Sequence, residues 1–486
     1  MRITVPERWT DPVRLAALAA AVSAAVLSLS SAPQRILYTY AWDYAEPVAA
    51  LSVLELGLRP LIYQDFQVVP YRVYAYNPFY VYLAAALRPL WESVWACGRA
   101  LSAVGAFAAA VSLYTIARSW GARRTLAFTV GAGWIAMPLV FRYLCSMRPD
   151  LTALGLTAAG LAVAMSTAGS EPQKRRYLLA AVSGLCFAAA FLSRQNFVLA
   201  PAAVFLARLT ERGRRGEGWW TVLACALAVL PVMAFFESAT SGAYLRNIVV
   251  FNLQPYYPQL VLRNLAGHLP LHWPMYAAAL IVLPQALREN RSRPLALYAL
   301  LALGEIVTAG RIGSDENYFL EPLLGAYLMV IWALCRAGRP VRSIALGVVA
   351  AILLCLVPYH VQARQGTLEA ITSTERDLEP VRQFLRTVPG PVLSEDMGLL
   401  ISAGLPVSYQ FFEATQLADR GLFDDRPFLE RIRRGDFPVV VVSTDLLHVT
   451  RSQRFRPEFV RALQEAYRLK GRHVGMLWFE PKSAAS

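Results

Sequence analysis

The sequence has little charge of either sign and almost no lysine. Asp, Glu, Lys and Arg make up only 16% of its 486 residues, against about 25% in ordinary soluble domains. Three lysines, Lys174, Lys470 and Lys482, stand among 47 basic residues, so arginine carries nearly all of the net charge of +14. Hydrophobic residues make up 56%, and the mean hydropathy is +0.40. This composition excludes a set of ordinary soluble domains and indicates a membrane protein.

Several motifs are also missing from the sequence. There is no Walker loop, no GxSxG elbow and no GxGxxG fingerprint, which disfavours chemistry driven by a bound nucleotide. His268 and His272 have a spacing seen in metal sites, but Pro270 lies between them and no HExxH motif accompanies them. The six cysteines lack CxxC spacing and lie in or beside apolar runs, so neither a disulfide framework nor a zinc site is indicated.

The positive charge is concentrated in the apolar part of the chain. Residues 1–360 carry 30 basic and 17 acidic residues, whereas residues 361–486 carry 17 and 16. Short loops beside membrane-spanning helices accumulate Arg and Lys. The surplus is therefore explained by a bilayer, and no nucleic-acid partner is expected.

Apolar runs of about 16 to 20 residues recur along the chain and are long enough to cross a hydrocarbon core of roughly 30 Å. They predict about eleven transmembrane helices, beginning near Leu15, Ala100, Leu126, Leu151, Tyr177, Phe197, Trp219, Trp273, Leu295, Phe319 and Ser343. A further segment, Asn77 to Leu90, is short and contains Pro78 and Pro89. We expect this segment to lie in the interface without crossing the membrane.

Basic clusters at every second boundary predict the orientation. If Asn77 to Leu90 does not cross, the clusters near residues 118–124, 174–176, 208–215, 288–293 and 336–342 all fall on one side, together with the N-terminus. Because positively charged loops stay inside, this side is the cytoplasm. We therefore predict a multi-pass protein of the inner (cytoplasmic) membrane with a cytoplasmic N-terminus.

The chain changes character after His360. Leu368 to Leu385 has helical periodicity, residues 391–396 and 438–443 are typical of short strands, and Pro457 to Leu469 is typical of an amphipathic helix. We predict a polytopic α-helical membrane part over residues 1–360, with a first outer loop and juxtamembrane helices over 33–98. A small extracytoplasmic α/β domain is expected over 361–486.

Charged residues converge on the predicted outer face. Charged side chains near a bilayer cost free energy, so a cluster of them indicates a structural or functional role. Asp43 and Glu46 follow the first span three residues apart, which places both carboxylates on one face of a helical turn. A capping pattern at the start of a juxtamembrane helix explains the same pair. Arg148 and Asp150 flank a proline at the outer end of a later span, where a salt bridge with Asp150 as helix cap is the structural alternative.

Two further polar segments lie on the same face. Residues 193–196, with Arg194 and Gln195, interrupt mostly apolar sequence; a solvated kink would explain them, but a buried arginine is costly unless it meets an anion. Residues 310–322 crowd polar groups at the head of a span, which an ordinary loop would also explain. Tyrosines in residues 71–82 and 254–257 could stack on sugar rings, although interfacial aromatic belts are the better explanation of the same tyrosines.

Taken in order, these features resemble the GT-C superfamily of polyprenyl-phosphate-sugar-dependent glycosyltransferases. The resemblance is to the branch related to protein O-mannosyltransferases and the lipid A aminoarabinose transferase. Asp43 and Glu46 match the acidic motif of the first outer loop, and Tyr76-Asn77-Pro78-Phe79-Tyr80 matches a proline-aromatic segment. Arg148-Pro149-Asp150 matches a motif at the fourth span, and Arg194-Gln195-Asn196 matches a Lys-rich turn. Residues 313–321 resemble a segment found in many bacterial members.

The resemblance implies an inverting glycosyltransferase that moves a sugar from a polyprenyl-phosphate donor to a hydroxyl-bearing acceptor, namely a glycan, lipid or protein. It gives the catalytic role to Asp43 and Glu46, with Asp43 preferred as base. Asp150 is the reserve, because the chain has Asp-Tyr-Ala-Glu where the nearest relatives have adjacent acids. The residues implied in donor binding are Arg148, Asp150, Arg194, Gln195, Arg311, Ser314, Asn317 and Tyr318.

Metal dependence and two other functions stay open at this point. Asp43, Glu46, Asp150, Asp315 and Glu316 could hold a hard divalent cation through oxygen, so no cofactor is certain. A transporter or flippase of lipid-linked sugars is one alternative, although transporters place polar groups near the bilayer midplane. A noncatalytic assembly subunit is the other, and it would need neither Asp43 nor the arginines.

Overall fold

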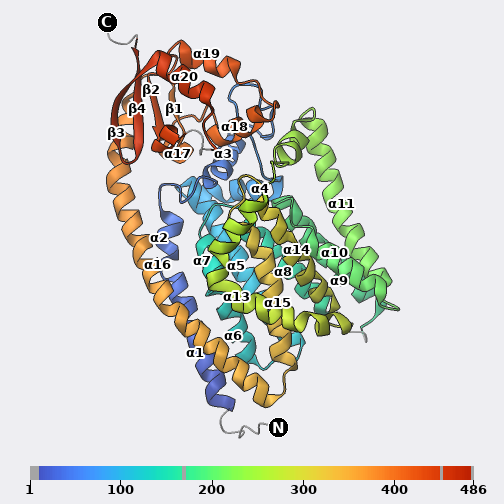
Figure 1. The fold of residues 1–486 in the computed structure, drawn as a ribbon. Helices are drawn as coiled ribbons and strands as arrows, with labels where there is room; N and C mark the ends of the chain where they lie inside the picture. The colour runs from blue at the N-terminus through green and yellow to red at the C-terminus, as the bar shows by residue number, and fades with distance from the viewer. Residues whose placement is uncertain (1–9, 167–170, 449–452, 483–486) are drawn as a thin grey trace.

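The structure, a computed structural model, describes residues 10–166, 171–448 and 453–482. Residues 1–9, where the predicted cytoplasmic N-terminus begins, lie outside the described residues. A bundle of apolar helices carries a smaller mixed domain at one end, and one long helix, α16, runs along both (Figure 1).

The helices of the bundle follow one another with short connections. The first are α1 (Thr10–Leu29), α2 (Ala32–Leu37), α3 (Glu46–Leu56), α4 (Pro78–Leu87), η2 (Arg88–Leu90), α5 (Val94–Ser119), α6 (Arg124–Ile135), α7 (Pro138–Tyr143) and α8 (Asp150–Ser166). There follow α9 (Gln173–Ser193), α10 (Leu199–Thr210), α11 (Arg215–Ala239), α12 (Ala243–Leu245), η3 (Arg246–Val250), α13 (Pro258–Arg288), α14 (Arg293–Glu305), η4 (Ile306–Gly310), η5 (Glu316–Phe319), α15 (Leu320–Arg336) and α16 (Arg339–Thr387).

The predicted polytopic membrane fold is confirmed, but the span count of about eleven is not. A helix overlaps each of the eleven predicted apolar runs. Within the described residues, seven helical segments are long and apolar enough to cross a membrane, and α8 and α10 are shorter apolar helices. Helix α6 has twelve residues and extends only about 18 Å at 1.5 Å per residue. It ends at a break at Ala136–Met137, although the apolar sequence continues beyond this break. Helix α13 contains three prolines and is not among these seven segments.

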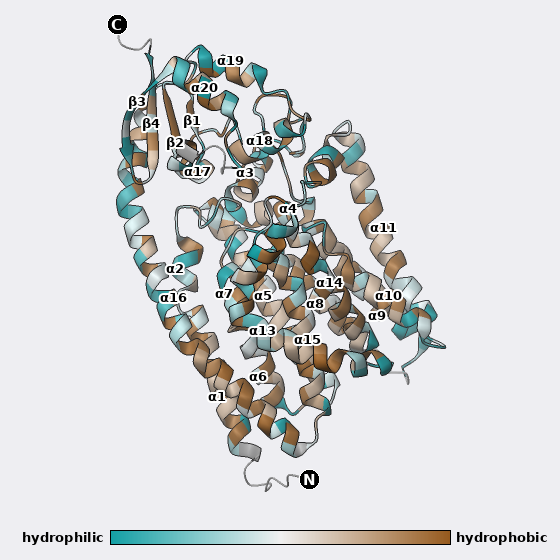
Figure 2. Cartoon of the chain, in the orientation of Figure 1, coloured by the Kyte–Doolittle hydropathy of each residue, from teal (hydrophilic) through white to brown (hydrophobic). Residues whose placement is uncertain are grey.

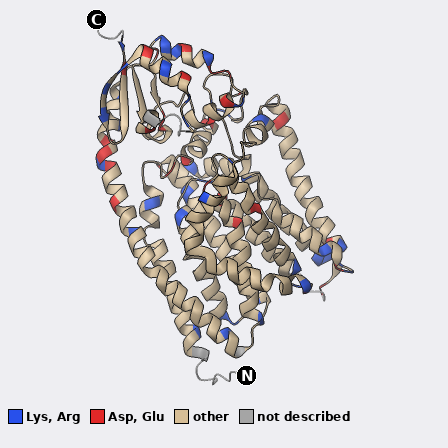
Figure 3. Ribbon diagram, in the orientation of Figure 1, with Lys and Arg blue, Asp and Glu red and all other residues tan. Residues whose placement is uncertain are grey.

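Apolar surface covers the bundle, and charge is rare within it. Hydrophobic residues dominate the helices of the bundle in Figure 2, and Figure 3 shows Lys, Arg, Asp and Glu gathered mostly at the ends of the helices and in the C-terminal domain. Helix α4 has ten residues, about 15 Å at 1.5 Å per residue, which is too short to cross. It starts at Pro78 because proline fits the first turn of a helix.

Helix α16 joins the two parts without interruption. The sequence predicts a break near His360 and a separate helix over residues 368–385, but the structure has one helix of 49 residues with Pro358 and Pro380 inside it. Its first half packs along α1, and its second half contacts the C-terminal domain. The whole helix is about 74 Å long at 1.5 Å per residue, and it connects the bundle directly to the C-terminal domain.

The C-terminal domain is a four-stranded mixed sheet with helices. Its strands are β1 (Val392–Ser394), β2 (Val439–Ser443), β3 (Tyr467–His473) and β4 (Met476–Pro481), in the order β1-β2-β4-β3. Strand β1 pairs parallel to β2, and the other pairs are antiparallel. Its helices are α17 (Met397–Ala403), α18 (Phe411–Asp419), α19 (Arg426–Arg433), η6 (Thr444–His448) and α20 (Pro457–Ala466).

The predicted strands over residues 391–396 and 438–443 are β1 and β2. The helix predicted over Pro457 to Leu469 is α20, but it ends at Ala466 because Tyr467 begins β3. The hairpin of β3 and β4 was not predicted. Its turn places Val474 and Gly475 at positive φ, a conformation that a non-glycine residue rarely adopts.

The first loop, residues 33–98, forms part of the core of the C-terminal domain. Val440 and Val442 of β2 pack with Tyr71 and Val73 of this loop, and Val439 and Val441 pack on the opposite face with Tyr38, Tyr40 and Val48. Alternate side chains of a strand point to opposite faces, so both faces of β2 are covered, as its continuous valine run predicts. The loop is thereby held between the bundle and the sheet.

Candidate functional site

Asp43 lies at the start of α3 with its two oxygens in different environments. Its Oδ1 accepts hydrogen bonds from the backbone N–H groups of Ala45 and Glu46, at 2.8 and 2.9 Å. Its Oδ2 lies 3.4 Å from Nη1 of Arg148, and the side chain is 34% exposed. Asp43 thus closes the turn before α3, whose N-cap is Ala45, and the predicted capping box with Glu46 is not formed. The other oxygen of Asp43 faces a cavity.

Glu46 has no free oxygen. Its Oε1 accepts from Arg99 Nε at 3.0 Å and from the Met147 N–H at 2.5 Å, and its Oε2 accepts from Arg99 Nη2 and the Trp42 N–H, each at 2.7 Å. Both side chains of the pair are fully buried. Arg99 also donates to the carbonyls of Tyr38 and Tyr40. Glu46, predicted as a catalytic candidate, is thus placed as a scaffold that fixes the first loop against α5 and the turn before α8.

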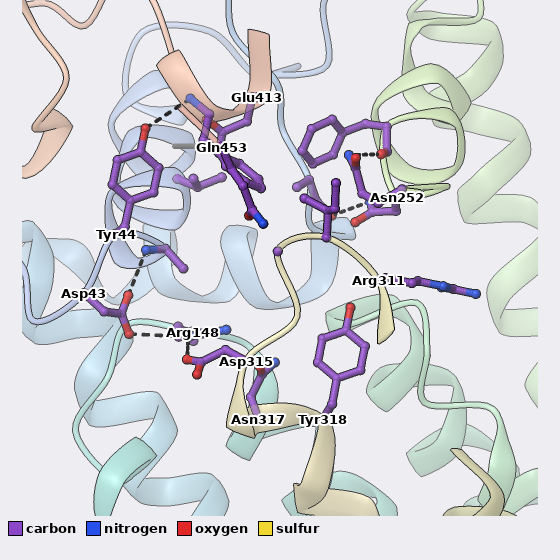
Figure 4. A pocket seen from close by; sticks show the side chains of 18 of the residues that line it. Asp43, Tyr44, Arg148, Asn252, Arg311, Asp315, Asn317, Tyr318, Glu413 and Gln453 are labelled. Carbon is purple, nitrogen blue, oxygen red and sulfur yellow. Dashed lines mark hydrogen bonds and ion pairs between the residues drawn. The ribbon is translucent and has the colours of Figure 1, made fainter. Parts of the chain in front are cut away.

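A cavity of about 520 Å³ lies where the first loop, the turn before α8, residues 311–318 and the C-terminal domain meet. Asp43, Arg148, Asp315, Asn317 and Tyr318 line it (Figure 4). Phe412, Glu413, Gln453 and Arg454 of the C-terminal domain also line it. The polar segments that the sequence singled out therefore meet in one place.

Arg148 is balanced by carboxylates on three sides. Asp43 lies at 3.4 Å, Asp150 at 3.4 Å and Asp315 at 3.6 Å from its guanidinium nitrogens. Burial opposes the charged form, but Asp43 and Asp150 hold the pKa of Arg148 well above its usual value. Arg148 is fully ionised and already neutralised before any ligand arrives.

Asp150 is a buried clamp at the start of α8. Its Oδ1 accepts from Arg194 and from Asn317 Nδ2, the latter at 2.7 Å. Neither carboxylate oxygen of Asp150 lines the cavity. The residue therefore orients Arg194 and Asn317, which do line it.

Two arginines of the same cavity have side chains without a close polar partner within the described ranges. The side chains of Arg263, in α13, and Arg311 form no hydrogen bond or ion pair with any residue that the structure describes. Both line the cavity beside Arg194, which donates to Asn196 Oδ1 at 2.9 Å. Arg263 was missed by sequence reasoning, because it lies outside every motif and cluster that the sequence shows.

A second cavity, of about 340 Å³, shares Arg194, Arg311, Tyr76 and Tyr318 with the first. Leu199 of α10, Leu301 of α14 and Val198 also line it, together with the polar residues Gln195, Asn196, Asn252, Glu305 and Thr308. The shared arginines therefore stand between a polar chamber and a partly apolar one. An amphiphile with an anionic group between a polar head and an apolar tail fits this arrangement.

The remaining predicted donor residues divide into two groups. Tyr318 lines both cavities, with Arg194 5.7 Å from its ring centroid, and Gln195 lines the second cavity while donating to the Ala75 carbonyl at 3.2 Å. Ser314 lines neither; it is buried and donates to the Ala309 carbonyl at 2.6 Å. Its contact fixes the loop that carries Arg311.

The carboxylates considered for a cation are paired with arginine instead. Asp315 and Glu316 both contact Arg142, and Asp315 accepts from the Tyr143 hydroxyl at 3.0 Å. Burial favours the neutral form of Asp315, but Arg148, the Glu316 N–H, Arg142 and the Tyr143 hydroxyl together outweigh it and lower the pKa of Asp315. Over the described ranges, no three His, Cys, Asp or Glu side chains are grouped so that they could hold a metal ion.

Comparison by sequence finds no relative: no protein-family model and no curated protein matches the chain. Comparison by structure does find proteins of similar fold. The apo structure of ArnT from Cupriavidus metallidurans, the lipid A aminoarabinose transferase, matches with a TM-score of 0.66 at 15% identity, over 93% of this chain and 97% of ArnT. The chain has a GT-C fold.

Other solved structures agree to different degrees. ArnT bound to undecaprenyl phosphate matches with a TM-score of 0.63 at 14% identity, over the same shares of both chains. The Archaeoglobus fulgidus oligosaccharyltransferase reaches only 0.49 at 14% identity, over 92% of this chain and 71% of its own. The GT-C resemblance of the polar segments agrees with the fold of ArnT, and a match over 93% of this chain extends beyond the helical bundle.

Proposed function

We propose that this protein is a membrane glycosyltransferase that moves a sugar from a polyprenyl-phosphate donor to a hydroxyl acceptor with inversion. The observation that carries the proposal is the pair of cavities joined at Arg194 and Arg311, with Asp43 Oδ2, which among the described residues contacts only Arg148, at 3.4 Å, in the polar one. The GT-C fold and the ArnT complex with undecaprenyl phosphate support the class of donor.

The donor phosphate is held by Arg194, Arg311 and Arg263. Hydrogen bonds between a guanidinium and a phosphate are charge-assisted and roughly twice as strong as neutral ones. Arg263 and Arg311 are free for this purpose, and Arg194 is aimed by Asp150 and Asn196. The first part of the polyprenyl chain then lies along Leu199 and Leu301 in the second cavity.

Arg148 has a smaller part in donor binding than the sequence predicts. Because Asp43, Asp150 and Asp315 already neutralise it, its charge attracts little further anion. It acts instead as a positioning group, which keeps Asp43 turned toward the cavity.

Asp43 is the catalytic base. Its Oδ2 takes the proton of the acceptor hydroxyl as that oxygen attacks the anomeric carbon. The bond from this carbon to the phosphate oxygen breaks on the opposite face, and the electron pair leaves with the polyprenyl phosphate. The arginines stabilise that leaving group without proton transfer. Glu46 does not enter the reaction, because Arg99 and two backbone N–H groups occupy it.

The reaction takes place at the outer face of the inner membrane. The basic clusters favour a cytoplasmic side opposite the C-terminal domain. Labelling of a single cysteine introduced at Gly121, in the turn between α5 and α6, tests this: an impermeant reagent should label it only in inverted vesicles, and labelling of intact cells contradicts the orientation.

Sugar transfer from a purified polyprenyl-phosphate sugar tests the proposal. The protein is reconstituted in lipid nanodiscs, and binding of undecaprenyl phosphate is measured beside turnover. Arg194→Ala should weaken that binding at least tenfold, whereas Arg288→Ala, at the exposed far end of α13, should not change it. Equal binding by both variants refutes the phosphate site, and lipid movement across the bilayer without turnover favours a flippase.

A further inference from the structure

The C-terminal domain places a carboxylate in the cavity that the proposed reaction does not use. Glu413 lies in the first turn of α18, and it lines the cavity together with Asp43 and Tyr44 (Figure 4). The Phe412 N–H donates to the Tyr44 hydroxyl at 3.3 Å. This contact joins α18 directly to the loop that carries the proposed base.

Glu413 is buried and lacks a partner on one oxygen. Its side chain is 4% exposed, and no described residue donates a hydrogen bond to Oε2. Buried polar atoms are nearly always hydrogen-bonded, and an exception needs a physical reason. Burial also raises the pKa of Glu413 to about 7, with Arg454 opposing the shift. An acceptor oxygen kept unpaired at the wall of a cavity is ready for a donor group from a ligand.

The neighbours of Glu413 favour hydroxyl groups over a cation as that donor. Arg263 and Arg311 line the same cavity without an ion-pair partner among the described residues, and their field repels a positively charged ligand. The rings of Tyr44 and Phe412 meet edge to face at 6.4 Å, and the Gln453 amide lies on the same side. Carboxylate, amide and aromatic side chains together match the hydroxyls and apolar faces of a carbohydrate.

We propose that Glu413 and Gln453 form a carbohydrate subsite in which Glu413 Oε2 accepts a hydrogen bond from a sugar hydroxyl. The inference rests on the proposed function and deepens it, because it gives the C-terminal domain a direct part in substrate selection. Both the donor sugar and a glycan acceptor bring such hydroxyls into the cavity. Glu413 is a specificity residue and takes no part in bond making.

Two binding measurements and one kinetic measurement test this subsite with the full-length protein in nanodiscs. Undecaprenyl phosphate and undecaprenyl-phosphate glucose differ only in the sugar, so their dissociation constants isolate its contribution. Transfer rates measured against acceptor concentration report on the acceptor. Glu413→Gln and Gln453→Ala are compared with Glu465→Gln, an exposed carboxylate of the same domain that pairs with Arg433.

Loss of a hydrogen bond to a charged group should cost about 10- to 100-fold in affinity. If the loss appears for undecaprenyl-phosphate glucose and not for undecaprenyl phosphate, the subsite holds the donor sugar. If donor binding is unchanged and the KM for acceptor rises by that factor, the subsite holds the acceptor. No change in either measurement, or equal loss for both lipids, overturns the proposal. Failure of the wild-type protein to bind undecaprenyl phosphate would instead refute the proposed function.

Discussion

The two acidic residues of the first loop, three positions apart, have opposite environments. Glu46 is enclosed by Arg99 and backbone N–H groups and has no capacity left for a ligand. One carboxylate oxygen of Asp43 accepts hydrogen bonds from the backbone, and the other faces Arg148 and the cavity. The same contrast separates Arg99, whose donors are all engaged, and Arg148, whose charge three carboxylates balance, from Arg263 and Arg311, which form no ion pair with a described residue. A charged residue near a membrane is therefore a candidate for catalysis only if some of its bonding capacity is unused.

The largest difference between the two carboxylates should appear in turnover. Asp43→Asn removes the proton acceptor, and loss of a general base typically costs about 100- to 10,000-fold in rate. Binding of undecaprenyl phosphate should stay within twofold of wild type. Steady-state transfer with Asp43→Asn, Glu46→Gln and Asp150→Asn side by side checks this. Retention of more than about a tenth of wild-type turnover by Asp43→Asn would move the base to another residue.

The saturated pair should matter for stability. Arg99→Ala leaves Glu46 buried without its partner, and breaking such a pair costs about 3 to 5 kcal/mol. Arg88→Ala, a nearby exposed arginine, should cost less than about 0.5 kcal/mol. Thermal unfolding in nanodiscs measures both. Equal midpoints for the two variants would show that the buried pair has no structural role.

The unpartnered Glu413 should make the protein less stable as the pH rises. Its pKa is raised from 4.5 to about 7 by burial, so the unfolded chain ionises first and stability falls between about pH 4.5 and 7. The full loss amounts to about 3 kcal/mol at 1.36 kcal/mol per unit. Glu413→Gln should unfold at a higher temperature than wild type at pH 8 and not at pH 4. A constant difference across this range would contradict the shift.

The open arginines should show the smallest single effects, because they share one phosphate. Arg263→Ala and Arg311→Ala should each weaken undecaprenyl phosphate binding about tenfold, since a charge-assisted hydrogen bond is worth about 1.5 to 3 kcal/mol. Arg148→Ala should weaken it less than either. Titration of the three variants orders them directly, and a larger effect from Arg148→Ala would show that the carboxylates do not neutralise it.

Local features of the fold were predictable from the sequence. The lengths of the apolar runs predicted the helices. The short segment bounded by prolines predicted α4, and the run of four valines predicted β2. Each of these features depends on neighbouring residues. The continuity of α16 was not predictable, since Pro358 and Pro380 favour a break that its packing against α1 and the C-terminal domain overrides. The hairpin of β3 and β4 was hidden because Tyr467 continues an apparent helical pattern.

The candidate site was predictable as a set of residues and not as a set of roles. Asp43, Arg148, Arg194, Arg311, Asn317 and Tyr318 do line one cavity. The burial of Glu46, however, depends on Arg99, 53 positions away. The place of Glu413 depends on contacts between α18 and the first loop, 368 positions earlier in the chain. Partners so distant in the sequence decide whether a charged side chain has an ion-pair or hydrogen-bond partner. A local motif does not show which residues these partners are.

The packing of the first loop around β2 has a consequence for how the chain is assembled. Tyr38, Val48, Tyr71 and Val73 are synthesised hundreds of residues before the valines of β2 that cover them. During synthesis this loop must wait with its apolar side chains uncovered, and exposed apolar surface of this kind is prone to aggregation. The valines of β2 therefore complete the folding of a loop made hundreds of residues earlier, and this loop matures only after synthesis has passed Ser443.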